Sequence, residues 1–517
     1  MLARLFALVG LIAIAACAGQ RGLPAVSSLQ AMPGVEPQAN TVVQGTIVTT
    51  SWVVPKGKTW SVGAKGIAVF AKSITIDGTL QVASGRHLVL LAPTIHINGK
   101  IAASDSGTTR TGSATVSDVI GACALQIGTP KTATAIPLAI PPGDRLYVSA
   151  TSANCTFDVY GYVVTSSGRN GSPKIVAVRA GETGGSIDIG TKTANAQTQA
   201  AAKSIKEKVT THAIKMLAIE GTISAGWGGA GANDTKGKFD EGTGTWSYNA
   251  GAGAPGGDVS IQAQTYMPLG STAFAVTAGR GGNGGAIGAP SLDGTAAKPN
   301  GGNISIVQSA GGRGGIVTLL GTASGQPPTS AGGAGGNAGT VSAAAGDGWS
   351  PLGGHGGNVD LTLAQPGPGG WNAAHVPGMN GSYPVMAFGG GNGGSGALGA
   401  VGGPGGSFVL VRPSAAPALP PSTITFYGFN GGAGGPKCGN GNVGAAGGAG
   451  GNFSENAKNS DFAVIFEGSN LFSAFSGGKG GNGGIDSPGA GGAAGKAYFN
   501  GTYVQAAGTT GNPGNGC

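Results

Sequence analysis

Charged and aromatic residues are scarce in this chain of 517 residues, at 10% and 6% of its length. Intrinsically disordered chains normally combine a high net charge with few apolar residues. This chain is instead 40% apolar, and its formal net charge is only +8. The one dense basic stretch lies at positions 203–208. Nucleic-acid binding needs a basic stripe with interleaved aromatic residues, so no nucleic-acid partner is predicted.

Glycine is the residue that the chain has in excess. There are 106 Gly and 29 Pro, and residues 218–517 hold 83 of those Gly, against 23 in residues 1–217. Helical bundles and ordinary α/β enzymes need long stretches with little Gly, because Gly is a poor helix former. Both classes are therefore disfavoured, and the chain divides into an ordinary N-terminal part and a Gly-rich C-terminal part.

The first residues have the pattern of an export signal. The apolar run Leu5–Ala16 follows Arg4 and is too short to span a bilayer, but it suits a signal peptide. It ends in Ile14-Ala15-Ala16-Cys17, which resembles the lipobox of bacterial lipoproteins. The resemblance implies a signal peptide at 1–16, a lipid on Cys17 within an anchor and tether at 17–44, and attachment to the outer membrane, at the cell surface or facing the periplasm. The alternative is a plain secretory signal with an accidental cysteine.

Four cysteines remain besides Cys17, an even number that suits disulfides in an oxidising compartment. Pairing of sequence neighbours gives Cys123–Cys155 and Cys438–Cys517, one of three connectivities. No CxxC and no His/Cys zinc spacing occurs, so no metal site is predicted.

Two segments, Ile67–Leu80 and His87–Ile101, repeat one pattern at a spacing of 21 residues, which aligns Ile74 with Ile95. Each segment has two alternating strands, then Asp or Asn followed by Gly78 or Gly99, where we expect a corner with positive φ. Repeats of about 20 residues whose strands each bury one face are typical of solenoids. The predicted fold is all-β, a single-stranded parallel β-helix (solenoid) with its first coils at 45–102. The pattern resembles the right-handed β-helix of pectin-lyase-like proteins and large bacterial adhesins.

Two insertions are predicted to interrupt the repeat. Residues 103–183 contain short strands and a Pro-Pro-Gly-Asp turn, and we interpret them as a small inserted β-sandwich held by Cys123–Cys155. Residues 184–224 hold an interrupted coil, in which 194–215 lack Gly and Pro and are predicted to form an inserted helix.

Residues 225–517 are predicted to continue as a Gly-rich solenoid. Gly-Gly pairs precede alternating strands, and residues 390–407 form six triplets that each begin with Gly. A three-residue period is typical of polyproline-II-type helices. These runs resemble the polyglycine-II layers of phage tail-tip adhesins and the GGxGG runs of mycobacterial Gly-rich proteins. Together with the lipobox, the resemblance is to a bacterial glycine-rich β-helix surface lipoprotein. The alternative is a set of loops between strands.

No complete catalytic constellation occurs, so no catalytic residue and no cofactor are predicted. One loop combines carboxylates with aromatic residues that could stack on sugars or surround an ion. This candidate ligand-binding loop consists of Trp227, Asp234, Asp240, Glu241, Trp246 and Tyr248.

The sequence leaves three functions open. The first is a cell-surface structural or adhesive lipoprotein that presents an extended solenoid to polysaccharide, lipopolysaccharide, cells or copies of itself. The second is a polysaccharide-degrading lyase or hydrolase on the same scaffold, and the third is a subunit of an extracellular filament. The membrane is a predicted partner through the N-terminal lipid.

Overall fold

The structure of the chain is a computed structural model. It describes residues 40–104, 115–132, 134–234, 237–240, 245–269, 275–286, 303–307, 311–320, 329–337, 359–360, 374–375, 385–389, 392–395, 401–411, 423–436, 444–456, 474–480, 488–499, 502–506 and 508–515. The predicted lipidation site Cys17, residue Glu241 and the predicted pair Cys438 and Cys517 lie outside these residues.

Almost all of the described strands belong to one sheet of parallel pairings, and part of this sheet closes on itself. The closed part is a parallel barrel of eleven strands. In order of pairing, these are β2 (Thr59–Ile76), β4 (Leu88–Leu91), β7 (Ser117–Ala122), β10 (Arg145–Ala150), β12 (Ile187–Ile189), β16 (Val259–Pro268), β13 (Ile214–Ser224), β11 (Thr156–Thr165), β9 (Leu138–Ile140), β6 (Lys100–Ala103) and β3 (Thr79–Val82), which returns to β2. Strands β5 (Thr94–Ile97) and β8 (Ala124–Ile127) connect β2 with β11 by a second route.

The predicted single-stranded parallel β-helix is therefore wrong. The sequence pattern suggested separate strands with breaks between them, but β2, β11, β13 and β16 continue round corners, and each pairs with two or three successive strands along one of its sides. Hydrogen bonding is thus continuous round the ring, and the sheet closes. The predicted β-sandwich at 103–183 is wrong as well, because β7 to β11 pair with β4, β5, β6, β12 and β13 in this same sheet.

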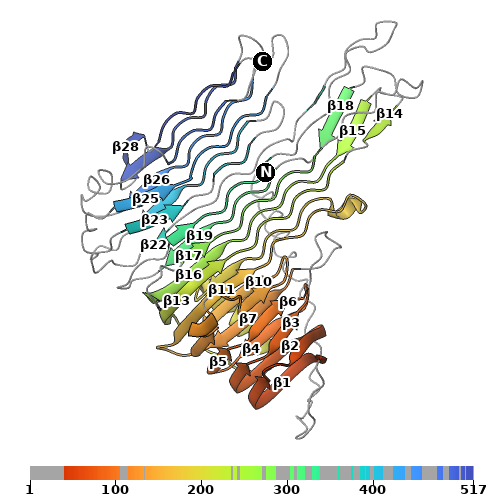
Figure 1. Cartoon of the computed structure of the whole chain (residues 1–517), viewed down its shortest axis with the longest axis vertical. Helices are drawn as coiled ribbons and strands as arrows, with labels where there is room; N and C mark the ends of the chain where they lie inside the picture. Colours follow the sequence, from red (N-terminus) through yellow and green to blue (C-terminus); the bar gives the residue numbers. More distant parts are fainter. Residues whose placement is uncertain are drawn as a thin grey trace, which may run out of the picture.

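The remaining strands extend the sheet at both ends of the molecule (Figure 1). Strand β1 (Asn40–Val54) pairs with β2 at one end. The other extension contains β17 (Ala275–Thr277), β19 (Val317–Leu320), β20 (Thr329–Ala331), β22 (Ala374–His375), β23 (Val385–Gly389), β24 (Phe408–Val411), β25 (Thr423–Tyr427), β26 (Phe453–Asn456), β27 (Lys496–Phe499) and the antiparallel β28 (Thr502–Ala506). A separate small sheet holds β14 (Lys238–Asp240), β15 (Thr245–Asn249), β18 (Asn303–Val307) and β21 (Val359–Asp360).

A helix, α2 (Lys192–Ser204), covers the outside of β7 and β10. The helix lies within residues 184–224, but it begins two residues before the predicted helix at 194–215 and ends well before residue 215. Thr191 caps its N-terminus by accepting a hydrogen bond from the backbone N–H of Ala194 at 3.1 Å. Lys206 has a positive φ of 62°, which a helix cannot continue through. Two short 3₁₀ turns, Pro130–Thr132 and Val176–Val178, complete the described helices.

The core fills the interior of the sheet with branched aliphatic residues and, towards the C-terminus, with phenylalanine. Ile74 pairs in register with Ile95, as the 21-residue spacing predicts, and both side chains are fully buried. Further along, the rings of Phe429 and Phe475 are stacked with centroids 4.3 Å apart. Because successive side chains of a strand point to opposite faces, the alternation of apolar and polar residues turns the apolar side chains of these strands towards the interior.

Candidate functional site

The Gly-rich runs leave the strands and pack side by side (Figure 1), and their backbone hydrogen bonds arrange them in two layers. We call them the first glycine layer (166–172, 225–232, 278–286, 331–337, 392–395, 428–435, 474–480 and 508–515) and the second glycine layer (179–185, 250–257, 311–316, 401–407, 444–452 and 488–495). Backbone hydrogen bonds connect neighbouring runs within each layer and also connect the two layers. The runs are thus ordered by their backbone groups.

The run from Gly279 to Gly285 shows the bonding rule. The N–H groups of Gly279, Gly282 and Gly285 donate across to carbonyl groups of run 251–257 in the second layer, at 2.8–2.9 Å. The N–H groups of Gly281 and Gly284 donate within the first layer to run 334–337, at 2.7 and 2.8 Å. Bonds in one direction recur every third residue, which is the period of a polyproline-II-type helix.

Glycine is required inside the layers because the runs approach very closely. A Cβ atom on Gly282 would lie 2.0 Å from the carbonyl oxygen of Gly229, and one on Gly279 would lie 1.7 Å from that of Gly226. Neither contact can be relieved by a side-chain rotation, because the opposing atoms belong to the backbone.

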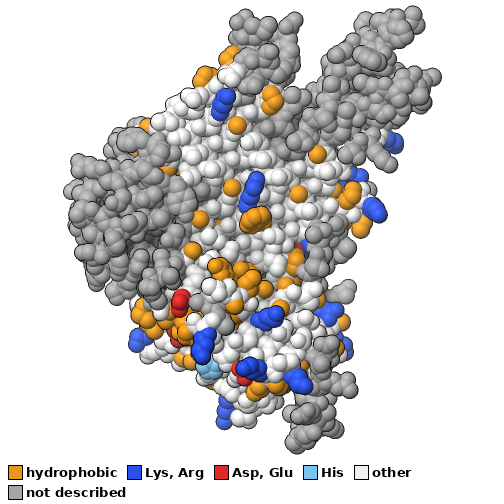
Figure 2. All heavy atoms as spheres, in the orientation of Figure 1, with side chains coloured by type: hydrophobic (Ala, Val, Ile, Leu, Met, Phe, Trp, Pro, Cys, Tyr) orange, Lys and Arg blue, Asp and Glu red, His pale blue; other side chains and the backbone are white. Residues whose placement is uncertain are grey.

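Only every third residue of a run points outward, and these residues form columns that cross the runs. In the first layer, the residues of one column each accept, through the carbonyl group, an N–H of the preceding run. This column includes Trp227, Arg280, Asn392, Asn430, Ser476 and Thr509. Its polar side chains reinforce the register, because Asn430 Oδ1 accepts the N–H of Ser476 at 2.8 Å and Asn392 Oδ1 accepts that of Asn430 at 3.0 Å. The neighbouring column, through Asn170, Asn283 and Asn337, does the same. Figure 2 shows a face on which uncharged polar and backbone atoms predominate, with isolated apolar side chains between them.

The largest exposed aromatic side chain of this outward face belongs to Trp227, which is 60% exposed. Its carbonyl group accepts the N–H of Gly168, and the next residue, Gly228, donates to the carbonyl group of Arg280, each at 2.7 Å. The backbone on both sides is therefore fixed. Arg280 and Asn283 are both exposed on the adjoining run. The backbone register places Arg280 opposite Trp227, and Asn283 is the next outward residue of that run.

Of the described residues of the predicted ligand-binding loop, Asp234, Asp240, Trp246 and Tyr248 belong to the β14–β15 hairpin or its base, and Trp227 lies apart from them. Asp234 uses Oδ1 to accept the N–H of Gly237 at 3.1 Å and Oδ2 to accept that of Asn249 at 2.8 Å, so both oxygens hold the base of the β14–β15 hairpin. Seven residues of extended run place Trp227 about 20 Å from Asp234. Asp240 and Trp246 lie on β14 and β15, and so does Tyr248, next to Asn249 on β15.

No protein-family model, curated protein or solved structure matches this chain. None of the described helices is long and apolar enough to cross a membrane. Among the described residues, no group of three or more His, Cys, Asp or Glu side chains could hold a metal ion.

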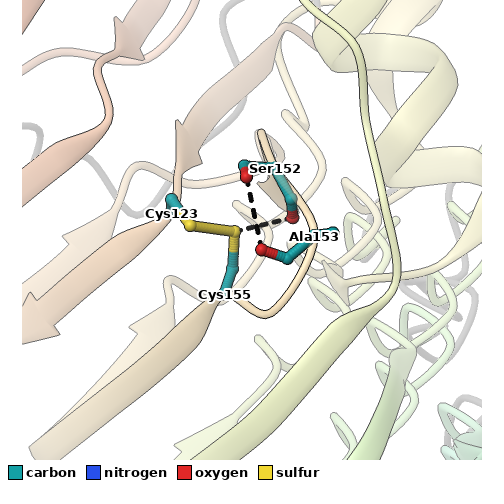
Figure 3. The surroundings of a disulfide bond; sticks show 4 residues. All are labelled: Cys123, Ser152, Ala153 and Cys155. Atoms are coloured by element: carbon teal, nitrogen blue, oxygen red, sulfur yellow. Dashed lines mark hydrogen bonds between the residues drawn. A yellow bond between two sulfur atoms is a disulfide. The ribbon is translucent and has the colours of Figure 1, made fainter.

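The predicted disulfide Cys123–Cys155 is confirmed. Cys123 lies in the corner between β7 and β8, Cys155 immediately precedes β11, and their Cα atoms are 4.4 Å apart (Figure 3). The N–H of Thr156 donates to the carbonyl group of Cys123 at 3.0 Å. The bond thus holds two neighbouring corners of the parallel sheet rather than an inserted domain.

Two buried aspartates, which sequence reasoning missed, anchor the ends of neighbouring strands. Asp118 Oδ1 accepts the N–H of Leu88 at 2.9 Å. Asp144 accepts the N–H of Val116 at 3.0 Å through Oδ1 and that of Gly85 at 3.3 Å through Oδ2. Both side chains are fully buried. Asp144 belongs to the Pro-Pro-Gly-Asp segment that the sequence predicts only as a turn, and no pattern pointed to its burial.

An ion pair adjoins these aspartates. Arg169 Nε lies 2.8 Å from Glu182 Oε2, Arg169 Nη2 donates to Oε1 at 3.2 Å, and both residues are nearly buried. Burial raises the pKa of Asp144 to about 7, against the opposing effect of the N–H donors of Val116 and Gly85, and Glu182 raises it further while Arg169 lowers it. A carboxyl group with this pKa exchanges a proton near neutral pH.

The pKa of Asp118 is also raised by burial. Burial and the nearby Asp144 raise the pKa of Asp118 well above its ordinary value, and the N–H of Leu88 opposes this. Its Oδ2 has no hydrogen-bond partner among the described residues. Burial without a partner for this oxygen disfavours the charged carboxylate. Because both aspartates are buried, a bound polymer cannot reach them in this arrangement.

Proposed function

We propose that this protein is a structural and adhesive protein of the cell surface that binds polysaccharide through the outward face of its first glycine layer. The observation that carries the proposal is that exposed Trp227 lies opposite exposed Arg280 on two backbone-bonded runs, with Asn283 as the next outward residue after Arg280. The lipobox-like N-terminus supports attachment to the outer membrane through Cys17, with this face presented beyond it.

The chemistry of the face suits sugars. An aromatic ring offers a flat apolar surface, on which the C–H face of a pyranose can stack, while a guanidinium group and an amide donate hydrogen bonds to ring hydroxyls. Outward residues recur about 9 Å apart along a run, and neighbouring runs lie roughly 5 Å apart. A grid with two fixed spacings suits a polymer that repeats its own hydroxyl groups.

The layers also suit adhesion because the site is built before ligand binds. Backbone hydrogen bonds hold Trp227 and Arg280 in adjoining runs, so little backbone ordering remains to oppose binding. A weak contact repeated along a polysaccharide then gains strength from the number of contacts made at once.

The test is binding of the full chain to a glycan array, followed by titration calorimetry with the polysaccharide that binds best. Trp227→Ala should weaken binding about tenfold through loss of the stacking surface. The matched control is Tyr162→Ala, which removes an exposed aromatic ring (39% exposed) from strand β11 and should leave affinity unchanged. Equal losses in both variants would contradict the proposed site, and release of reducing ends from the bound glycan would contradict a purely adhesive role.

A further inference from the structure

Positive charge is concentrated at the end of the molecule that contains β1. Residues 40–103 hold six basic residues, Lys56, Lys58, Lys65, Lys72, Arg86 and Lys100, and one acidic residue, Asp77. This segment therefore carries a net charge of +5, whereas the whole chain carries +8. The lysine and arginine side chains gather over the N-terminal strands in Figure 2 and are sparse over the glycine layers.

These cations lie around the rim of the end strand. Strand β1 pairs only with β2 among the described strands, in three stretches that correspond to three sides of the sheet. Lys56 is exposed in the turn after β1, and Lys65 and Lys72 are exposed on β2. Each side of β1 also exposes one valine, which is Val42 at 66%, Val48 at 60% or Val53 at 41%. Cationic and apolar side chains thus alternate round the rim.

A cleft of about 370 Å³ begins at the same rim. Lys58, Asp77, Gly78, Asn98 and Lys100 are among its lining residues. The N–H of Lys100 donates to the carbonyl group of Gly78, and Asn98 Nδ2 donates to Asp77 Oδ1, at 2.9 and 2.8 Å. The single acidic side chain of this end is therefore bonded to a neighbouring amide, whereas two lysines line the cleft.

We propose that the β1 end of the sheet docks on an anionic lipid surface, with phosphate headgroups entering the cleft between Lys58 and Lys100. Basic residues near an anionic bilayer each contribute to binding, and apolar side chains between them enter the interface. The proposal does not depend on glycan binding by the first glycine layer. It is consistent with the predicted lipid on Cys17, because β1 is the first described strand after that residue.

Charge argues for a lipid surface over a second copy of the chain. Two copies that paired through their β1 edges would bring two ends of net charge +5 into contact, and this repulsion opposes association. With an anionic bilayer, the electrostatic interaction of this positively charged end is attractive instead of repulsive.

The experiment measures partition of the full chain onto vesicles, with Cys17→Ser in every arm so that no lipid on Cys17 anchors the chain. Vesicles contain phosphatidylglycerol with phosphatidylcholine, or phosphatidylcholine alone. The triple variant Lys58→Gln, Lys65→Gln, Lys100→Gln is compared with the matched triple variant Lys203→Gln, Lys208→Gln, Lys215→Gln, whose lysines are exposed on α2 and in the segment from α2 into β13 and do not line the cleft. Because all arms share the same N-terminal residues, their contribution cancels.

At low salt, the first triple variant should partition onto phosphatidylglycerol vesicles about 100-fold more weakly than the parent, and the control triple should lose much less. The difference should shrink as salt rises, because screening weakens charge attraction. Equal losses in the two triples, or equal partition of the parent onto both kinds of vesicle, would overturn the proposal. Analytical ultracentrifugation without lipid adds a second criterion, since a parent dimer that the first triple variant abolishes would assign the surface to a second copy instead.

Discussion

The substitution Gly282→Ala tests whether backbone contact between the glycine layers stabilises the fold. The added Cβ would lie 2.0 Å from the carbonyl oxygen of Gly229, at least 1 Å closer than real Cβ contacts allow. The run must therefore move, which strains the bonds from Gly282 N–H to Ala254 and from Gly312 N–H to Gly282, now 2.8 and 2.7 Å long. Overpacking costs about 1–3 kcal/mol, and each weakened bond costs about 1 kcal/mol. We expect the free energy of unfolding to fall by roughly 3–5 kcal/mol.

Urea unfolding of the full chain measures this loss, and hydrogen exchange locates it. Arg280→Ala is the matched control, because it changes an exposed side chain of the same run and should alter the free energy of unfolding by no more than about 0.5 kcal/mol. In the Gly282→Ala variant, the amides of Gly282 and Gly312 should exchange faster than in the control. If Gly282→Ala proves as stable as Arg280→Ala and protects both amides equally well, close packing of the layers does not stabilise the protein.

Three further predictions concern the closed sheet and the columns. The pKa of Asp144 is raised by folding, so its contribution to stability is fully present at acidic pH and is lost as pH rises through about 7. The free energy of unfolding from urea titrations should therefore be about 3 kcal/mol greater at pH 5 than at pH 8 because of this group, and a smaller value at pH 5 than at pH 8 would contradict its burial. Replacing both Cys123 and Cys155 by Ala should reduce the free energy of unfolding by about 3–4 kcal/mol for a 32-residue separation, and an unchanged urea midpoint would refute this. Asn430→Ala should cost about 1 kcal/mol by leaving the N–H of Ser476 without its acceptor, whereas Lys479→Ala on the adjoining run should cost almost nothing.

Local strand features of this protein could be predicted from its sequence because they depend on neighbouring residues. The spacing of 21 residues places Ile74 beside Ile95, and the alternating pattern buries both. The gap in Gly and Pro after residue 190 indicates a helix, and α2 lies within it. The Cys123–Cys155 pair also follows from sequence proximity.

The closure of the sheet could not be predicted, since it depends on whether a strand breaks or bends at a corner. Gly78 and Gly99 illustrate the difficulty. The sequence predicts a positive φ at both, but neither has one, whereas Gly221 does, at 132°. At Gly99 the requirement is instead close approach, because a Cβ atom would lie 2.0 Å from the carbonyl oxygen of Gly78. The same residue type thus serves two geometries that sequence alone does not separate.

The buried acids were missed for a related reason. Asp118 and Asp144 are 26 residues apart in sequence and come close only because β7 and β10 pair side by side. The ion pair of Arg169 with Glu182 lies near them because the runs that follow these strands also lie side by side. Polar side chains on half-exposed strands resemble surface residues in a single sequence. Their raised pKa values follow from burial, which only the fold determines.

The scarcity of charge in the C-terminal part follows from the geometry of the columns. Outward residues of neighbouring runs are about 5 Å apart, and two like charges at that distance repel by about 1 kcal/mol even in water. A column of lysines or aspartates would add this cost at every run. Asn and Ser avoid it and also accept the N–H of the next run, as Asn392, Asn430 and Ser476 do in succession. The layers thus favour glycine inside and small uncharged polar residues outside, and charge collects at the β1 end, where no further run is stacked among the described residues.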